Sequence, residues 1–180
     1  FIWYGSQTGL GSLGTPSNAD WVLECNQDTA LFGSTVSTAG DVNGDGYSDI
    51  IIGAPNYDNG QLNEGKVFAY FGSSAGPSAS SDWTEEINEA GSLFGYSVSV
   101  AGDVNGDGYC DVIVGAYLNN TAHVYHGFPS GLSLTSDWTR EGNQTDSEFG
   151  YSVSTAGDVN GDGYSDVIIG AKLSDNGQTD

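Results

Sequence analysis

Short apolar stretches separated by glycine-rich turns recur along the chain. One kind is an unbroken β-branched run that follows an aspartate, found at residues 49–52, 111–114 and 166–169. Such a run is typical of a strand that is buried on both faces. A second kind alternates polar and apolar residues, found at residues 34–38, 96–100 and 151–155. That alternation predicts a half-buried strand, and no segment shows the period of an amphipathic helix.

Two further strands complete each repeating unit. Aromatic stretches at residues 66–71 and 122–126 end at a glycine-containing turn, which predicts a third strand. A weaker fourth strand is expected around an Asp-Trp pair, whose tryptophans are Trp21, Trp83 and Trp138. A Phe-Gly pair marks the units, since Phe94 follows Phe32 by 62 residues and Phe149 follows Phe94 by 55. Four strands in a unit of roughly 40–60 residues predict an all-β fold of the β-propeller type, with four-stranded antiparallel blades.

The repeat divides residues 1–180 into two whole blades and two complementary halves. We expect blades at residues 32–93 and 94–148, strands three and four of a half blade at residues 1–31, and strands one and two of another at residues 149–180. Unpaired sheet edges are a liability, so the tail of one copy is expected to pair with the head of a second copy. Propellers close with about 4–8 blades, so three blades' worth per chain predicts a six-bladed ring formed by a homodimer. The alternative is a piece of a longer single-chain propeller.

An acidic nine-residue loop lies between the first two expected strands of each unit. It begins at Asp41, Asp103 or Asp158 and carries oxygen-bearing side chains at loop positions 1, 3, 5 and 9. Ca²⁺ prefers six to eight oxygen ligands; the glycine at position 6 allows the sharp turn, and the carbonyl of position 7 can face the ion. The sequence therefore predicts about three calcium ions per chain. The expected metal-binding residues are Asp41, Asn43, Asp45, Tyr47, Asp49, Asp103, Asn105, Asp107, Tyr109, Asp111, Asp158, Asn160, Asp162, Tyr164 and Asp166.

These loops have two alternatives to a calcium site within a β-hairpin. The helix–loop–helix calcium hand needs a bidentate glutamate at loop position 12. That position is Ile52, Val114 or Ile169 here, each inside a β-branched run, so the loop departs from that motif. Without a metal, the same residues would form three ordinary Asp/Asn/Gly turns.

Composition narrows the classes of partner. The formal net charge is −21, which disfavours nucleic acid and anionic membrane as partners, because both need a basic surface. No apolar run approaches the roughly 20 residues of a membrane-spanning helix. The two cysteines, Cys25 and Cys110, do not form a disulfide framework and are expected to be thiols.

At these residues the chain resembles the FG-GAP repeat family, the blades of the integrin alpha-subunit β-propeller. The similarity covers Phe-Gly, the acidic loop and Gly-Ala-Pro, although Tyr117 and Lys172 replace Pro55 in the later units. The resemblance implies Ca²⁺ held in hairpin loops between the first and second strands of a blade. It implies ligands from the side chains at loop positions 1, 3, 5 and 9 and from the carbonyl at position 7. The integrin-type ring has seven blades, which departs from the ring expected here.

The leading hypothesis for function is a non-enzymatic calcium-binding module for protein or glycan binding, or adhesion, in an extracellular, cell-surface or periplasmic setting. No catalytic motif is present, and the two histidines, His123 and His126, align with the packing residues Phe68 and Phe71. An alternative is a structural assembly unit without a ligand of its own. A lectin, or the propeller part of a larger extracellular enzyme, is a further alternative.

Overall fold

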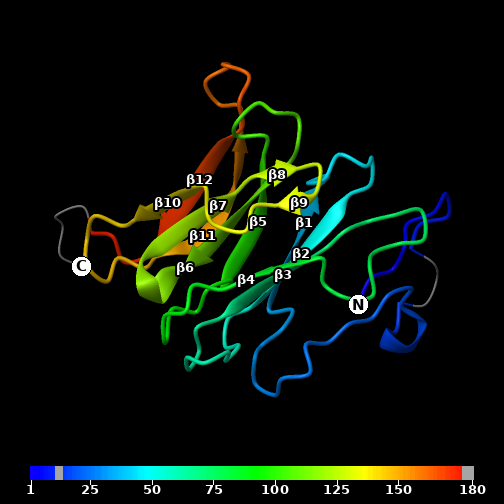
Figure 1. The fold of residues 1–180 in the computed structure, drawn as a ribbon, viewed down its shortest axis with the longest axis horizontal. Helices are drawn as coiled ribbons and strands as arrows, with labels where there is room; N and C mark the ends of the chain where they lie inside the picture. The colour runs from blue at the N-terminus through cyan, green and yellow to red at the C-terminus, as the bar shows by residue number, and fades with distance from the viewer. Residues whose placement is uncertain (11–13, 176–180) are drawn as a thin grey trace.

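The computed structural model describes residues 1–10 and 14–175, and these residues form an all-β arrangement of antiparallel sheets (Figure 1). The first sheet has the strand order β1 (Thr35–Gly40), β2 (Asp49–Ala54), β3 (Lys66–Tyr70) and β4 (Trp83–Glu85). The second sheet has the equivalent order β5 (Ser97–Gly102), β6 (Asp111–Ala116), β7 (Thr121–Tyr125) and β10 (Trp138–Glu141). Four-stranded sheets of this order are consistent with propeller blades, and the strands predicted for these two sheets are confirmed.

Smaller elements accompany the two sheets. A terminal hairpin pairs β11 (Phe149–Gly157) with β12 (Asp166–Ala171), and a minor hairpin pairs β8 (Gly127–Phe128) with β9 (Gly131–Leu132). In the described part of the chain, the helical content is two short 3₁₀ turns, η1 (Pro16–Asn18) and η2 (Tyr117–Asn119). Across residues 1–10 and 14–175, no helix has the length and apolar character needed to cross a membrane.

The N-terminal segment, residues 1–31, is less regular than the sequence predicts. Instead of two paired strands, its described part contains a single antiparallel bridge between Ile2 and Trp21. A lone two-stranded ribbon is only marginally stable in water, because it lacks further strands with which to bury an apolar face. The segment is held by packing against the first sheet, where Trp21 meets the Tyr70 ring edge-on at 5.2 Å.

Three apolar layers hold the N-terminal segment, the two sheets and the terminal hairpin in a row. Alternation along a strand sends neighbouring residues to opposite layers. In β2, Ile52 packs with Phe68 and Tyr70 under the N-terminal segment, whereas Ile51 packs with Val98 against the second sheet. The N-terminal segment and the terminal hairpin lie at opposite ends of this row, as the blue and red ends of the chain show in Figure 1.

The glycines of the Phe-Gly and Gly-Ala pairs bring the backbones of consecutive sheets into contact. A Cβ atom on Gly53 would collide with the carbonyl oxygen of Gly95, and one on Gly115 would collide with that of Gly150. Gly95 and Gly150 both have positive φ angles, +82° and +89°, which L-residues rarely adopt. Both halves of the repeat motif therefore have a steric reason to be glycine.

Candidate metal centre

The three acidic loops connect the first two strands of each sheet or hairpin, and they lie along one edge of the row (Figure 1). In the first loop, the carboxylate of Asp41 accepts hydrogen bonds from several backbone N–H groups of the loop. The N–H groups of Gly44 and Gly46 donate to its Oδ1 and Oδ2 at 2.7 and 2.8 Å. The N–H of Tyr47 donates to Asp45 Oδ1 at 2.9 Å. These bonds close the loop into a compact turn lined by oxygen atoms.

The second and third loops repeat this geometry. Asp103 accepts hydrogen bonds from the N–H groups of Gly106 and Gly108 at 2.7 and 2.9 Å. Asp158 accepts the equivalent bonds at 2.7 and 2.9 Å. The third loop keeps this form even though its hairpin has only two strands, so the loop conformation is a local property of the sequence.

The aspartate at loop position 9 has a structural task that the spacing alone does not reveal. Asp111 is fully buried and accepts hydrogen bonds from the N–H groups of Val104 and Gly127, both at 2.8 Å. Asp49 likewise accepts hydrogen bonds from the N–H groups of Val42 and of Gly72, which follows β3, both at 2.8 Å. The position-9 carboxylate thus ties its loop to the end of the third strand. A glycine at a fixed distance after each aromatic strand was the available sequence signal for this role.

Burial, hydrogen bonding and neighbouring charges shift the pKa values of these carboxylates. Desolvation raises the pKa of Asp49, hydrogen bonds from Gly72 and Val42 oppose the rise, and the nearby charges of Asp45 and Asp41 add to it. Desolvation likewise raises the pKa of Asp111. By contrast, backbone N–H donors, first that of Gly163, lower the pKa of the exposed Asp158. The mutual repulsion around Asp49 is the kind of energy that a bound cation removes.

The loops offer the chemistry that calcium requires, although their carboxylates are not gathered around one point. Among residues 1–10 and 14–175, no group of three His, Cys, Asp or Glu side chains is arranged to hold a metal ion. The donor set is nevertheless made only of carboxylate, amide and carbonyl oxygens, which suits a hard cation. A carboxylate that accepts two backbone N–H bonds keeps further lone pairs. The residues therefore fit Ca²⁺ by donor type, and the expected ligand set stays a proposal.

The other chemistry-bearing side chains have packing roles. His123 is buried, its Nε2 lies 3.0 Å from Thr121 Oγ1, and burial lowers its pKa to about 4. Trp83 packs edge-on against Tyr125 at 5.2 Å and donates from Nε1 to the carbonyl of Ser133. The expected packing within the blades is confirmed for His123 and Trp83. His126 instead lies just after β7, partly exposed, with its Nδ1 3.7 Å from Asp137 Oδ1. The two cysteines are free.

Comparison with known families adds to this geometry. The model of the FG-GAP repeat matches residues 32–70, 94–126 and 149–180, which together make up more than half of the chain. The chain belongs to the FG-GAP repeat family. The matched FG-GAP segments contain all three acidic loops and the Phe-Gly and Gly-Ala glycines that bring neighbouring backbones together.

Curated relatives of this FG-GAP chain are integrin alpha proteins. It is 34% identical to integrin alpha-3 of Cricetulus griseus over 161 residues, covering 86% of this chain and 15% of the relative. It is 34% identical to integrin alpha-4 of Xenopus laevis over 160 residues, covering 81% and 15%. Integrin alpha-IIb of Homo sapiens is 38% identical over 122 residues, covering 67% and 11%. The chain thus spans about 15% of the length of the first of these relatives.

Proposed function

We propose that this FG-GAP chain is a calcium-stabilised, non-enzymatic β-propeller module that binds a protein ligand at the cell surface or outside the cell. The observation that carries the proposal is the acidic loop, which takes one hydrogen-bonded form three times within FG-GAP repeats. Its relatives are integrin alpha proteins, which supports an adhesion-type role rather than catalysis. The net charge of −21 fits a chain that is neutralised in part by divalent cations.

In each loop, the side chains at positions 1, 3, 5 and 9 and the carbonyl at position 7 would hold the ion. In the first loop these residues are Asp41, Asn43, Asp45, Asp49 and Tyr47. The ion would supply positive charge where three carboxylates repel one another, and it would stabilise the fold by mass action above its dissociation constant. The chain's own contribution is the turn itself, which the backbone N–H bonds to Asp41 already close.

Calcium titration of the chelator-treated chain tests this proposal. We expect the melting temperature to rise with Ca²⁺ and to respond less to Mg²⁺, which demands a smaller octahedral site. Terbium luminescence should report three sites, since each loop carries a tyrosine as sensitiser. Asp45→Ala, Asp107→Ala and Asp162→Ala should each remove one site, whereas Asp28→Ala, outside the loops, should remove none. An unchanged melting curve together with no terbium signal would overturn the metal sites.

Two classes of ligand are candidates for the proposed binding function. A protein ligand is favoured by the integrin relatives, and a glycan is the second candidate because exposed aromatic residues such as Phe1 and Tyr4 could serve as sugar platforms. Pull-down from extracellular matrix and a glycan array separate the two. If neither assay detects binding, the alternative of a structural assembly unit without a ligand of its own would be favoured.

Self-association is also proposed here, as the six-bladed ring that two copies would close. The support is that the chain presents strands one and two of a sheet in the terminal hairpin and the residues matching strands three and four in the N-terminal segment. A circular arrangement of this kind removes exposed sheet edges.

A further inference from the structure

The three acidic loops are joined to one another by main-chain hydrogen bonds. The N–H of Cys110 in the second loop donates to the carbonyl oxygen of Asp41 in the first loop at 3.0 Å. The N–H of Ser165 in the third loop donates to the carbonyl oxygen of Asp103 in the second loop at 2.8 Å. In both cases position 8 of one loop bonds to position 1 of the loop before it, so the same link is made twice.

The tyrosine at loop position 7 covers the same junction. A Cβ atom on Gly44 would collide with the ring of Tyr109. Likewise, a Cβ atom on Gly106 would collide with the ring of Tyr164. Each glycine stands at position 4 of the earlier loop, where its N–H donates to the position-1 carboxylate at 2.7 Å. The ring therefore lies against the turn that this carboxylate closes, whereas the carbonyl of the same tyrosine belongs to the expected ligands of its own loop.

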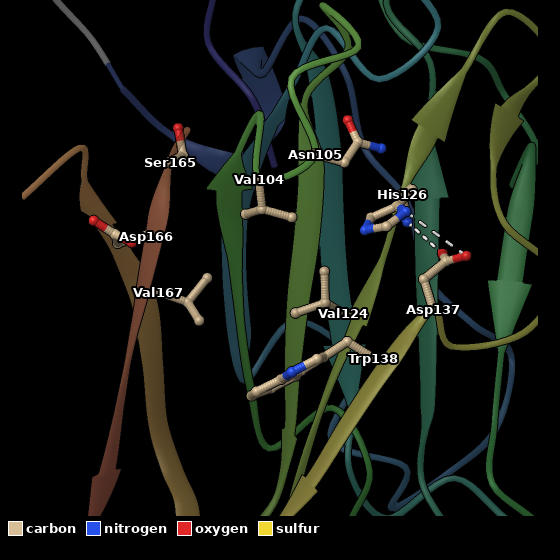
Figure 2. Close-up of a pocket in the computed structure, with 9 residues that line it drawn as sticks. All are labelled: Val104, Asn105, Val124, His126, Asp137, Trp138, Ser165, Asp166 and Val167. Carbon is tan, nitrogen blue, oxygen red and sulfur yellow. Dashed lines mark hydrogen bonds and ion pairs between the residues drawn. The ribbon is translucent and has the colours of Figure 1, made fainter. Parts of the chain in front are cut away.

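Side chains at loop position 8 complete the contact. A Cβ atom on Gly40, which directly precedes the first loop, would collide with the side chain of Cys110. One on Gly102, which directly precedes the second loop, would collide with that of Ser165. Ser165 and Val104 of the second loop also line one cavity of about 390 Å³, as Figure 2 shows. Each junction therefore consists of a hydrogen bond, an aromatic ring and a position-8 side chain, all between elements that the structure describes.

We propose that the three loops bind calcium as a coupled row, in which an ion in one loop raises the affinity of the adjacent loop and leaves the non-adjacent loop unaffected. The inference rests on the calcium sites proposed above and adds how those sites regulate one another. In the second loop, the expected ligands at positions 7 and 9, Tyr109 and Asp111, flank Cys110. An ion held by these residues would therefore fix in place both the ring and the N–H that contact the first loop.

Preorganisation is the physical route of this coupling. A loop that its neighbour already holds in the binding conformation loses less conformational freedom when an ion enters, so it binds the ion more tightly. The effect is reciprocal, because an ion in the first loop must favour binding in the second by the same factor. One intramolecular hydrogen bond corresponds to about twofold to tenfold in affinity, and this sets the expected size of the coupling.

Charge acts against this coupling. Each loop carries three carboxylates, and an ion that neutralises part of this charge weakens the attraction felt by the next ion. Salt screens the effect, since the Debye length falls from about 8 Å at 0.15 M to about 3 Å at 1 M. The positive coupling made by the loop contacts should therefore increase with salt concentration, whereas the negative coupling that charge alone produces would fade.

Calcium titration by isothermal calorimetry tests the inference on chelator-treated chains that keep two of the three loops. Asp162→Ala leaves the adjacent first and second loops, and Asp45→Ala leaves the adjacent second and third loops. Asp107→Ala leaves the non-adjacent first and third loops and is the matched control. For the adjacent pairs we expect a Hill coefficient above 1, with each ion bound about twofold to tenfold more tightly when the neighbouring loop is filled. The non-adjacent pair should bind as two independent sites.

Substitutions of the position-7 tyrosine in the Asp162→Ala background separate the contact from the ligands. Tyr109→Ala keeps the position-7 carbonyl but removes the ring from Gly44, so the coupling between the first two loops should weaken. Tyr109→Phe keeps the ring and should retain the coupling. Tyr47→Ala is the matched control and should also retain it, because residues 1–40 contain no acidic loop for the Tyr47 ring to cover.

The possible results distinguish this inference from the metal sites on which it rests. Calcium binding with equal Hill coefficients for adjacent and non-adjacent pairs would overturn the coupling and leave the metal sites standing. Coupling that Tyr109→Ala leaves as strong as in the control would overturn the assigned contact. If neither the wild-type chain nor any variant binds calcium, the metal sites themselves are wrong, and the coupling falls with them.

Discussion

Replacing Asp111 by alanine gives the most direct test of the position-9 carboxylate as a structural tie. The side chain is fully buried and accepts two backbone hydrogen bonds at 2.8 Å, from Val104 and Gly127. Hydrogen bonds to a charged group contribute about 1.5–3 kcal/mol each, so losing both costs roughly 3–6 kcal/mol. Burial disfavours the charged form and raises the pKa of Asp111, which offsets part of the hydrogen-bond energy. We therefore expect a loss near the lower end of the range of roughly 3–6 kcal/mol. A loss of about 3 kcal/mol is a large share of a typical total stability of about 5–15 kcal/mol.

The measurement is urea unfolding followed by tryptophan fluorescence, with a chelator present so that metal binding does not contribute. Asp107→Ala is the matched control in the same loop, since Asp107 is exposed and accepts its backbone bond from the N–H of Tyr109. We expect this control to lose less than about 1 kcal/mol, as exposed hydrogen bonds contribute little. Asp111→Asn should fall between the two, because one amide N–H₂ would face a backbone donor. Equal small losses for Asp111→Ala and Asp107→Ala would refute the reasoning.

Two further predictions concern the stability contributed by the glycine contact between sheets and by the buried His123. Gly115→Ala places a Cβ against the carbonyl oxygen of Gly150 and should lower stability by about 1–3 kcal/mol in a chemical unfolding curve, whereas Gly14→Ala, in open space, should not. If both alanine variants unfold together with the wild type, the close backbone contact is wrong. His123 has a pKa lowered by burial to about 4, so the unfolded chain, with a pKa near 6.5, binds the proton more tightly, and stability falls as the pH drops through that window. At about 1.4 kcal/mol per pKa unit, this group removes about 2 kcal/mol by about pH 5, and His123→Phe should reduce the drop in melting temperature between about pH 7.5 and that pH. An identical drop in both proteins would contradict the assigned protonation.

Much of the fold could be predicted because its strands follow two simple sequence patterns. The β-branched runs after Asp49 and Asp111 became β2 and β6, and the alternating segments before the acidic loops became β1 and β5. The hairpin β8–β9 was missed, because strands of two residues leave no period to detect. The N-terminal segment was predicted as two strands and its described residues contain one bridge, since strand propensity alone does not pair a ribbon without neighbours.

For the candidate metal site, residue spacing predicts which side chains lie on the loop but not which hydrogen bonds they make. Residue spacing identified oxygen-bearing side chains on one loop, and the structure places them there. Spacing does not tell which of those oxygens accept backbone N–H groups, and so the structural tie made by Asp49 to Gly72 was not anticipated. Likewise, the repeat of Asp-Trp predicted packing, but the edge-on partners of Trp21 and Trp83 became clear only from the arrangement of consecutive sheets.

The contact between Gly53 and Gly95, repeated between Gly115 and Gly150, is made by main-chain atoms. A joint of this kind does not depend on which side chains surround it, so a copied unit fits its new neighbour without compensating substitutions. The loop after β2 can meanwhile lengthen or shorten, as the difference between the connections at residues 55–65 and 117–120 shows. Tandem gene duplication can therefore extend such an array one unit at a time, while selection diversifies the outer loops independently of the joints.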